Sequence, residues 1–157
     1  MHEAPDYFLR EGRLVSGDAA VALIVVDGAK YLLQLRDQKP GIFYPGHWGL
    51  FGGALDAGET PSVALRRELF EELGFAPREI TYFTEFGFDF SPHDGCKVIR
   101  RYYEVHVAAR EVEYMKLSEG ADLRVFAVDD LLGRERVTPY DAMAIWMHAT
   151  RRVHRLR

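Results

Sequence analysis

The residues best suited to chemistry are three glutamates in the segment 53–75, GALDAGETPSVALRRELFEELGF. Glu68, Glu71 and Glu72 are spaced at i, i+3 and i+4, and an α-helix turns by about 100° per residue. In a helix the three carboxylates therefore share one face, where they repel one another. A divalent cation removes this repulsion, and hard oxygen ligands suit Mg²⁺ or Mn²⁺, which also bind substrate phosphates. The spacing thus predicts a divalent-cation site on one helix.

The residues around these glutamates predict the helix that carries them. Thr60 is a suitable N-cap, Pro61 suits the first turn, and Gly74 is a suitable stop. An apolar stripe at i, i+4 and i+8 runs beside the acidic face and consists of Leu65, Leu69 and Leu73. Upstream, the paired glycines at 52–53 allow the backbone to approach a ligand closely. The segment therefore predicts a helix over 60–73 that mounts a metal site beside a glycine-rich loop.

The same segment resembles the Nudix box, G-x5-E-x7-R-E-U-x-E-E-x-G-U, in which U is a bulky apolar residue. All nine specified positions are filled here, by Gly53, Glu59, Arg67, Glu68, Leu69, Glu71, Glu72, Gly74 and Phe75. The chain is therefore similar to the MutT-like members of the Nudix hydrolase family. The strand-like segments around the box extend the resemblance to about residues 15–150.

The resemblance implies a fold and a reaction. The fold is an α/β/α sandwich with a mixed central sheet, one catalytic helix and a C-terminal helix. The reaction is metal-dependent cleavage of a phosphoric anhydride in a nucleoside diphosphate linked to another moiety. Substrates of this kind are (deoxy)nucleoside triphosphates, nucleotide sugars, ADP-ribose and dinucleotides, and the implied cofactor is Mg²⁺ or Mn²⁺.

The resemblance also implies roles for the box residues. Glu68, Glu71 and Glu72 are the expected metal ligands, and the Gly53 carbonyl is a weaker candidate. Arg67 is expected to orient these groups rather than to react. Its expected partner is Glu59, so that these two residues form a structural ion pair.

The general base and the substrate contacts are less well specified. The base is either a box glutamate or Glu119, which precedes the last expected strand. The alternative interpretation of Glu119 is an ordinary glutamate in a turn. Arg36 is a phosphate contact or a surface arginine, and Trp48 is a substrate contact or a core aromatic. Four aromatic residues are candidates for stacking on a base, with none singled out: Tyr44, Phe86, Phe88 and Tyr140.

Two other functions are weighed against hydrolysis. A non-catalytic nucleotide sensor is the main alternative, but such domains often lose box glutamates that this chain keeps. A Nudix-like isomerase needs a catalytic cysteine, and Cys96 lies outside a recognisable motif for one. The chain has Leu50-Phe51 where MutT-like proteins often carry proline before the paired glycines. This departure weakens any transfer of substrate from the branch that removes oxidised nucleotides.

Length and composition favour one domain over residues 1–157. A chain of 157 residues with 48% hydrophobic residues can bury one sizeable core. The net charge of −4 gives no reason to expect nucleic-acid or membrane partners. The resemblance to Nudix hydrolases implies a small nucleotide as the partner. A homodimer stays open, because relatives often dimerise. The single cysteine and the lack of an apolar run in residues 1–12 favour the cytoplasm.

Hydrophobic patterns and turn residues predict an α+β chain. The expected strands are 18–26, 30–36, 79–90, 97–109 and 124–128, with a short extended piece at 47–51 and a turn at 91–95. The expected helices are 60–73, a helical turn at 129–132 and a final helix over about 139–153. Thr138 and Asp141 are spaced as in a capping box at the start of that last helix.

Overall fold

The computed structural model describes residues 14–93 and 96–154. Its strands are β1 Ala19–Val26, β2 Lys30–Leu35, β3 Trp48–Gly49, β4 Phe51–Ala54, β5 Thr81–Asp89, β6 Lys97–Val107 and β7 Asp122–Phe126. Its helices are α1 Pro61–Leu73, α2 Ala109–Val112, α3 Val128–Arg134 and α4 Pro139–His154, with a 3₁₀ turn η2 at Ser91–His93. Residues 1–12, where no leader is expected, and 94–95 of the predicted turn lie outside the described residues.

The strands form one mixed sheet of seven strands in which β1 is central. Along its whole length β1 pairs in parallel with β6. On its other edge β1 changes partner: residues 19–22 pair with β4, and residues 25–26 pair with β2, both antiparallel. Because β2 and β4 pair with different parts of β1, the end of β2 is separated from β4 next to Gly52 and Gly53.

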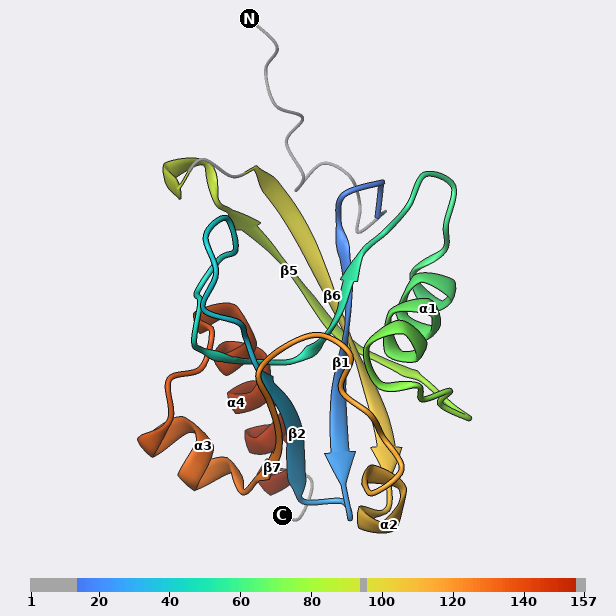
Figure 1. Ribbon diagram of the computed structural model, residues 1–157, viewed down its shortest axis with the longest axis vertical. Helices are drawn as coiled ribbons and strands as arrows, with labels where there is room; N and C mark the ends of the chain where they lie inside the picture. The colour runs from blue at the N-terminus through green and yellow to red at the C-terminus, as the bar shows by residue number, and fades with distance from the viewer. Residues whose placement is uncertain (1–13, 94–95, 155–157) are drawn as a thin grey trace, which may run out of the picture.

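Helices cover both faces of the sheet, α1 on one side and α3 with α4 on the other (Figure 1). Successive residues of β1 alternate between the two cores. Ala20, Ala22, Ile24 and Val26 join the core beneath α1, whereas Ala19, Val21, Leu23 and Val25 join the core beneath α3 and α4. Both faces of β1 are thus covered, which accounts for its uninterrupted apolar sequence. The predicted α/β/α sandwich with a mixed sheet is confirmed.

Several local predictions need correction. The strand expected at 124–128 is β7, Asp122–Phe126, and α3 already begins at Val128. The extended piece expected at 47–51 is two strands, because Leu50 separates β3, which pairs with β2, from β4, which pairs with β1. The strand expected to reach residue 109 ends at Val107, and α2 follows. The Ala108 amide donates to Glu111 Oε2 at 2.7 Å, so a capped helical turn replaces the last strand residues. None of the helices in the described ranges is long and apolar enough to cross a membrane.

The final helix begins as expected, but not with a capping box. The Thr138 amide donates to the Trp48 carbonyl at 2.9 Å, so it is not paired with Asp141. Instead the Thr138 hydroxyl donates to Asp141 Oδ2 at 2.9 Å. The buried Asp141 carboxylate also accepts from the Leu50 amide and from Arg100, each at 3.0 Å. Because a buried carboxylate needs several donors, Asp141 joins α4 to β6 and to the segment before β4.

Candidate active site

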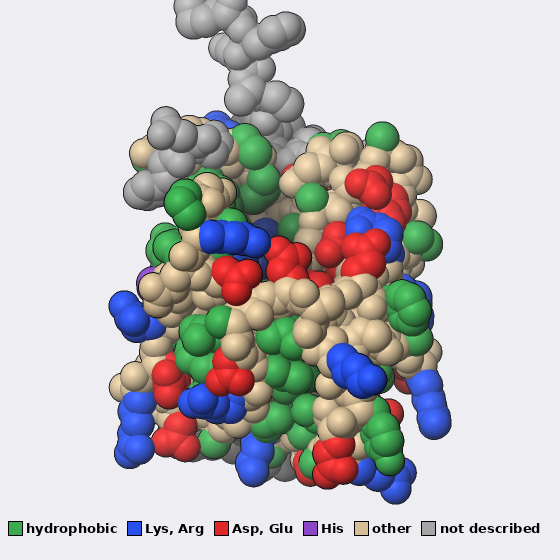
Figure 2. All heavy atoms as spheres, in the orientation of Figure 1, with side chains coloured by type: hydrophobic (Ala, Val, Ile, Leu, Met, Phe, Trp, Pro, Cys, Tyr) green, Lys and Arg blue, Asp and Glu red, His purple; other side chains and the backbone are tan. Residues whose placement is uncertain are grey.

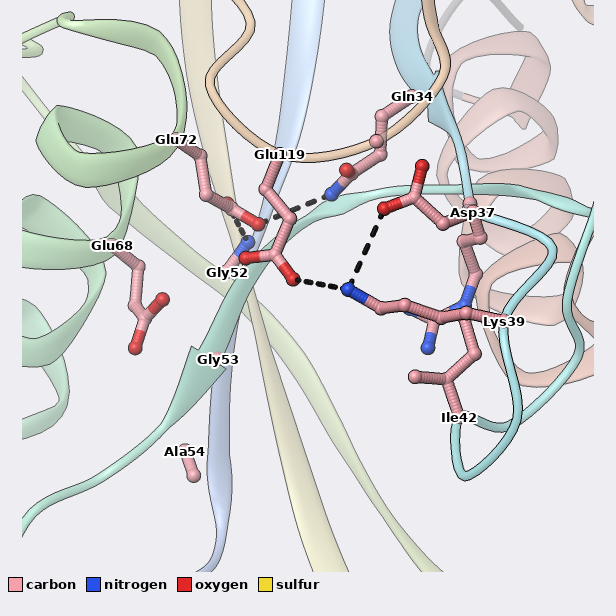
Figure 3. A pocket seen from close by; sticks show the side chains of 12 residues that line it. Gln34, Asp37, Lys39, Ile42, Gly52, Gly53, Ala54, Glu68, Glu72 and Glu119 are labelled. Atoms are coloured by element: carbon pink, nitrogen blue, oxygen red, sulfur yellow. Dashed lines mark hydrogen bonds and ion pairs between the residues drawn. The ribbon is translucent and has the colours of Figure 1, made fainter.

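A pocket of about 290 Å³ opens where β1 changes partner. Its walls come from the end of β2 and the loop after it, from β4, from α1 and from the loop before β7 (Figure 3). The predicted site residues that line it are Arg36, Gly53, Glu68, Glu72 and Glu119. Acidic side chains gather on this face of the molecule, with basic side chains close to them (Figure 2).

Helix α1 holds the box glutamates as predicted. The Thr60 side chain accepts a hydrogen bond from the Val63 amide, and the helix ends at Gly74, whose φ is 62°. The stripe of Leu65, Leu69 and Leu73 is fully buried. This anchoring turns Glu68 and Glu72 toward β4 and the pocket. Glu71 lies further out, with 58% of its side chain exposed.

The two glycines of β4 make room for these carboxylates. Gly52 has a φ of +129°, and a Cβ there would lie 2.2 Å from the Ala20 carbonyl oxygen. A Cβ on Gly53 would lie 2.6 Å from the carboxyl carbon of Glu68. Larger residues would therefore disturb the β1–β4 pairing at the first position and displace Glu68 at the second.

Glu72 is tied to two strands. Its Oε2 accepts from the Gly52 amide at 3.0 Å, and its Oε1 accepts from Gln34 Nε2 at 3.1 Å. Burial raises the pKa of Glu72 to about 7, against the lowering effect of these two hydrogen bonds, and the charges of Glu68 and Glu119 raise it further. Gln34 was not expected at the site, since nothing in the sequence links it to a residue 38 positions away.

Arg67 organises the outer side of the site. Its Nε and Nη2 each donate to one oxygen of Glu59 at 2.9 Å, so the predicted ion pair is confirmed and is bidentate. Its Nη1 donates to Glu68 Oε1 at 2.7 Å, and Nη2 also donates to the Ala54 carbonyl at 3.1 Å. The hydrogen bonds from Arg67 and from the Asp56 amide lower the pKa of Glu59 to about 2. Arg67 thus joins the loop after β4 to α1.

Glu119 enters the pocket from a loop that is fixed at both ends. The Ser118 amide donates to the Glu72 carbonyl at 3.0 Å, and the Ala121 amide donates to the Leu35 carbonyl at 2.8 Å. The loop is therefore bound both to the end of α1 and to β2. The Glu119 carboxylate itself is 69% exposed and lies 3.7 Å from Lys39 Nζ. The structure thus brings Glu119 to the same pocket as Glu68 and Glu72.

The donor set fits a hard divalent cation. Glu68 and Glu72 both line the pocket, and the missing Cβ of Gly53 leaves room for the Glu68 carboxylate close to β4. Carboxylate oxygens are the ligands that such a cation prefers. Within residues 14–93 and 96–154, no group of three or more Asp, Glu, His or Cys side chains lies close enough together to hold a metal ion. Arg67 accounts for part of the separation between the glutamate carboxylates, because it forms ion pairs with Glu68 at 2.7 Å and with Glu71 at 3.5 Å.

The two predicted substrate contacts lie in different surroundings. Arg36 lines the pocket, and its Nε donates to the Phe43 carbonyl at 2.9 Å. Trp48 is only 5% exposed, and its ring packs edge-on against Phe126 with centroids 4.8 Å apart. Trp48 is not among the residues that line the pocket. The structure therefore brings Arg36, but not Trp48, to the glutamates.

The four aromatic candidates lie together in one group. Phe43 and Phe90 join them, and we define the aromatic cluster as Phe43, Tyr44, Phe86, Phe88, Phe90 and Tyr140. The Tyr140 centroid lies 5.7 Å from that of Phe90, which in turn lies 5.0 Å from that of Phe43. Phe43 directly follows Ile42, a residue of the pocket wall. The two-residue spacing of Phe86, Phe88 and Phe90 along one strand face is the signal that would have added Phe90.

Comparisons with known proteins agree with this geometry. Residues 17–145 match the NUDIX domain family. The nucleoside triphosphatase NudI of Escherichia coli O139:H28 (strain E24377A / ETEC) is 50% identical over 52 residues, which are 33% of this chain. That match spans only 36% of the relative's length.

Solved structures extend the likeness over most of the chain. A MutT NUDIX hydrolase from Burkholderia pseudomallei is 28% identical with a TM-score of 0.69, over 82% of this chain and 94% of its own. The NUDIX domain of Shewanella oneidensis NrtR, solved with ADP ribose, has a TM-score of 0.69 over 95% of this chain and 99% of its own. Its identity is 18%, so it supports the fold alone.

Proposed function

Because the chain belongs to the NUDIX domain family, we propose that it is a metal-dependent pyrophosphohydrolase acting on a nucleoside diphosphate linked to another moiety. The observation that carries this proposal is the convergence of Glu68, Glu72 and Glu119 on one pocket, from α1 and from a separate loop. The carboxylate of an ordinary surface glutamate is exposed to water and lacks hydrogen bonds to two strands. Glu72 is half-buried and hydrogen-bonded to two strands.

Glu68, Glu71 and Glu72 would hold Mg²⁺ or Mn²⁺, with the Gly53 carbonyl as a weaker candidate. When bound, the cation would neutralise phosphate charge and lower the pKa of a bound water. Arg67 keeps Glu68 in position through the 2.7 Å hydrogen bond and fixes the neighbouring loop through Glu59. Its role in this proposal is to orient the ligands rather than to touch the substrate.

Glu119 is proposed to accept the proton of the attacking water or to supply a further oxygen ligand. Its loop is bonded to α1 and β2, so its carboxylate is carried by a fixed backbone at the pocket. A box glutamate acting as the base is the alternative. Glu119→Gln separates the two, since unchanged turnover in that variant would remove Glu119 from the mechanism.

The remaining substrate contacts follow from the walls of the pocket. Arg36 would contact phosphate, and the aromatic cluster would stack on the base, beginning at Phe43. A substrate contact by Trp48 stays a prediction that its buried position does not support. A single domain over residues 1–157, a cytoplasmic location, a homodimer and the lack of a nucleic-acid partner also stay predictions.

The first substrates to test are nucleoside triphosphates, because the NudI relatives are nucleoside triphosphatases. Nucleotide sugars, ADP-ribose and dinucleotides complete the panel, each with Mg²⁺ or Mn²⁺. Glu72→Gln should abolish turnover, whereas Glu79→Gln, an exposed glutamate outside this pocket, should leave turnover unchanged. Turnover that survives Glu72→Gln would overturn the proposal. Nucleotide binding without turnover by the wild-type protein would favour the sensor alternative.

A further inference from the structure

Lys39 places a positive charge beside the acidic groups of the pocket. Its Nζ lies 3.7 Å from Glu119 Oε1 and 3.6 Å from Asp37 Oδ2, between these two carboxylates (Figure 3). Within the described part of the chain, Glu119 has no second ion-pair partner. The ammonium group therefore competes for the carboxylate that the proposed mechanism uses to bind a cation or to accept a proton.

The two partners of this ion pair differ in how firmly they are held. Glu119 belongs to a loop whose backbone is hydrogen-bonded to Glu72 on one side and to Leu35 on the other. Lys39 extends on a four-carbon stem from the loop after β2, and 52% of its side chain is exposed. An exposed ion pair at this distance is weak. The Lys39 side chain can therefore leave the ion pair at a small cost in free energy, while the loop backbone that carries Glu119 stays fixed.

A divalent cation changes the balance of this pair. Once a cation with two charges is bound by the pocket carboxylates, it repels the Lys39 ammonium and competes with it for Glu119. A polyphosphate next to that cation attracts the same ammonium. Arg36 is the other basic residue of the pocket wall, and its Nε is already bonded to the Phe43 carbonyl. Lys39 is therefore the cation better able to change partner.

We propose that Lys39 has two successive partners, Glu119 in the metal-free protein and the substrate polyphosphate in the loaded protein. The second step rests on the proposed function, whereas the first depends only on cation binding. Lys39 thus opposes metal binding before the nucleotide arrives and strengthens nucleotide binding afterwards. The consequence is a preference for cation and polyphosphate together over either of them alone.

The test is Lys39→Met, measured in two ways. Mn²⁺ titrated into nucleotide-free protein should bind about threefold more tightly than to wild type, because its competitor is gone. The KM for the nucleoside triphosphate should rise about tenfold, with a smaller change in kcat, because a charged phosphate contact is lost. Lys39→Arg keeps the charge and should stay near wild type in both measurements. Lys30→Met, at the exposed start of β2, is the matched control and should change neither.

A double-mutant cycle with Glu119→Gln identifies the partner. With Glu119 replaced, Lys39→Met should tighten Mn²⁺ binding by less than it does in the wild-type background, because only the direct repulsion between the cation and the ammonium is then removed. An equal tightening in both backgrounds would overturn the first step, as would Mn²⁺ affinity that is unchanged or weaker in Lys39→Met. An unchanged KM would overturn the second step. If wild-type protein turns over no nucleotide, the proposed function fails, and the Mn²⁺ titrations still decide the role of the Lys39–Glu119 pair.

Discussion

Glu72 Oε2 accepts a hydrogen bond from the Gly52 amide at 3.0 Å, which joins α1 to β4 beside the pocket. Gln34, on β2, donates to the other oxygen of the same carboxylate at 3.1 Å. One side chain therefore connects the three elements that meet where β1 changes partner. Because this position is shielded from water, the pKa of Glu72 rises to about 7, and the ionised side chain destabilises the metal-free protein.

The effect of Glu72→Gln on the stability of the metal-free protein is expected to become more favourable as pH rises. The pKa of Glu72 is about 7 in the folded state and 4.5 in the reference state, so the wild-type free energy of unfolding falls as pH rises through this window. Glutamine has no such titration. The gain in free energy of unfolding from the substitution should therefore be about 2 kcal/mol larger at pH 8 than at pH 5.

Urea denaturation in the presence of a chelator measures this difference. Glu113→Gln, which replaces an exposed glutamate outside the pocket, is the control and should show no change of this kind between the two pH values. A gain from Glu72→Gln that is equal at both pH values would contradict an elevated pKa. Added Mn²⁺ at pH 8 should stabilise the wild-type protein more than the variant, because the variant lacks the Glu72 carboxylate as a ligand for the cation.

The spacing of residues in the sequence was sufficient to predict the acidic helix. The site residues that this spacing did not predict are brought to the pocket by contacts between distant parts of the chain. Helical geometry alone places Glu68 and Glu72 on one face, and Thr60 and Gly74 mark the ends of the helix. The contact between Gln34 and Glu72 joins residues 38 positions apart, and no periodicity encodes it. The same holds for the aromatic cluster, whose members come from three separate segments of the chain.

The misplaced boundaries have a similar origin. A strand pattern at 47–51 does not show that one part pairs with β2 and the other with β1. The Thr138-to-Asp141 spacing fits a capping box, yet Asp141 is drawn to donors on β6 and near β4. In both cases a tertiary partner decides between local conformations that the sequence allows equally.

Alanine at each of the two glycines of β4, Gly52 and Gly53, should have opposite consequences for stability and for metal binding. In Gly52→Ala the new Cβ meets the Ala20 backbone, which cannot move without breaking the pairing of β1 with β4. The free energy of unfolding should fall by at least about 3 kcal/mol. In Gly53→Ala the Cβ meets the flexible end of Glu68, so stability should change by less than about 1 kcal/mol.

Mn²⁺ titration separates these two variants further. Gly53→Ala displaces a proposed ligand, so its affinity for Mn²⁺ should fall about tenfold while its unfolding transition stays near that of wild type. Each variant thus serves as the control for the other. A Gly53→Ala protein that binds Mn²⁺ as wild type does would show that Glu68 is not displaced or is not a ligand.

Glu59→Gln should lower the stability of the folded protein at neutral pH, and should lower it much less in acid. The pKa of Glu59 is lowered to about 2, so its stabilising contribution is complete above pH 4.5 and is lost as pH falls toward 2. Glutamine cannot form the bidentate ion pair with Arg67. The difference in urea midpoint between wild type and variant should therefore shrink steadily from pH 5 to pH 3. A difference that stays constant over this range would assign the effect to packing instead of charge.

Phe43→Ala tests whether the aromatic cluster contacts the base. Phe43 is 38% exposed, follows the pocket residue Ile42 and packs at a tilt against Phe90, so part of its side chain is accessible next to the pocket wall. Stacking of a base on an aromatic ring contributes about 1–3 kcal/mol, which corresponds to a rise of at least about fivefold in KM for a nucleoside triphosphate. Inorganic tripolyphosphate has no base, and its binding should be unchanged. Phe70→Ala, at an exposed phenylalanine of α1 outside the cluster, is the matched control. Equal weakening of both ligands by Phe43→Ala would mean that the ring supports the loop after β2 rather than the base.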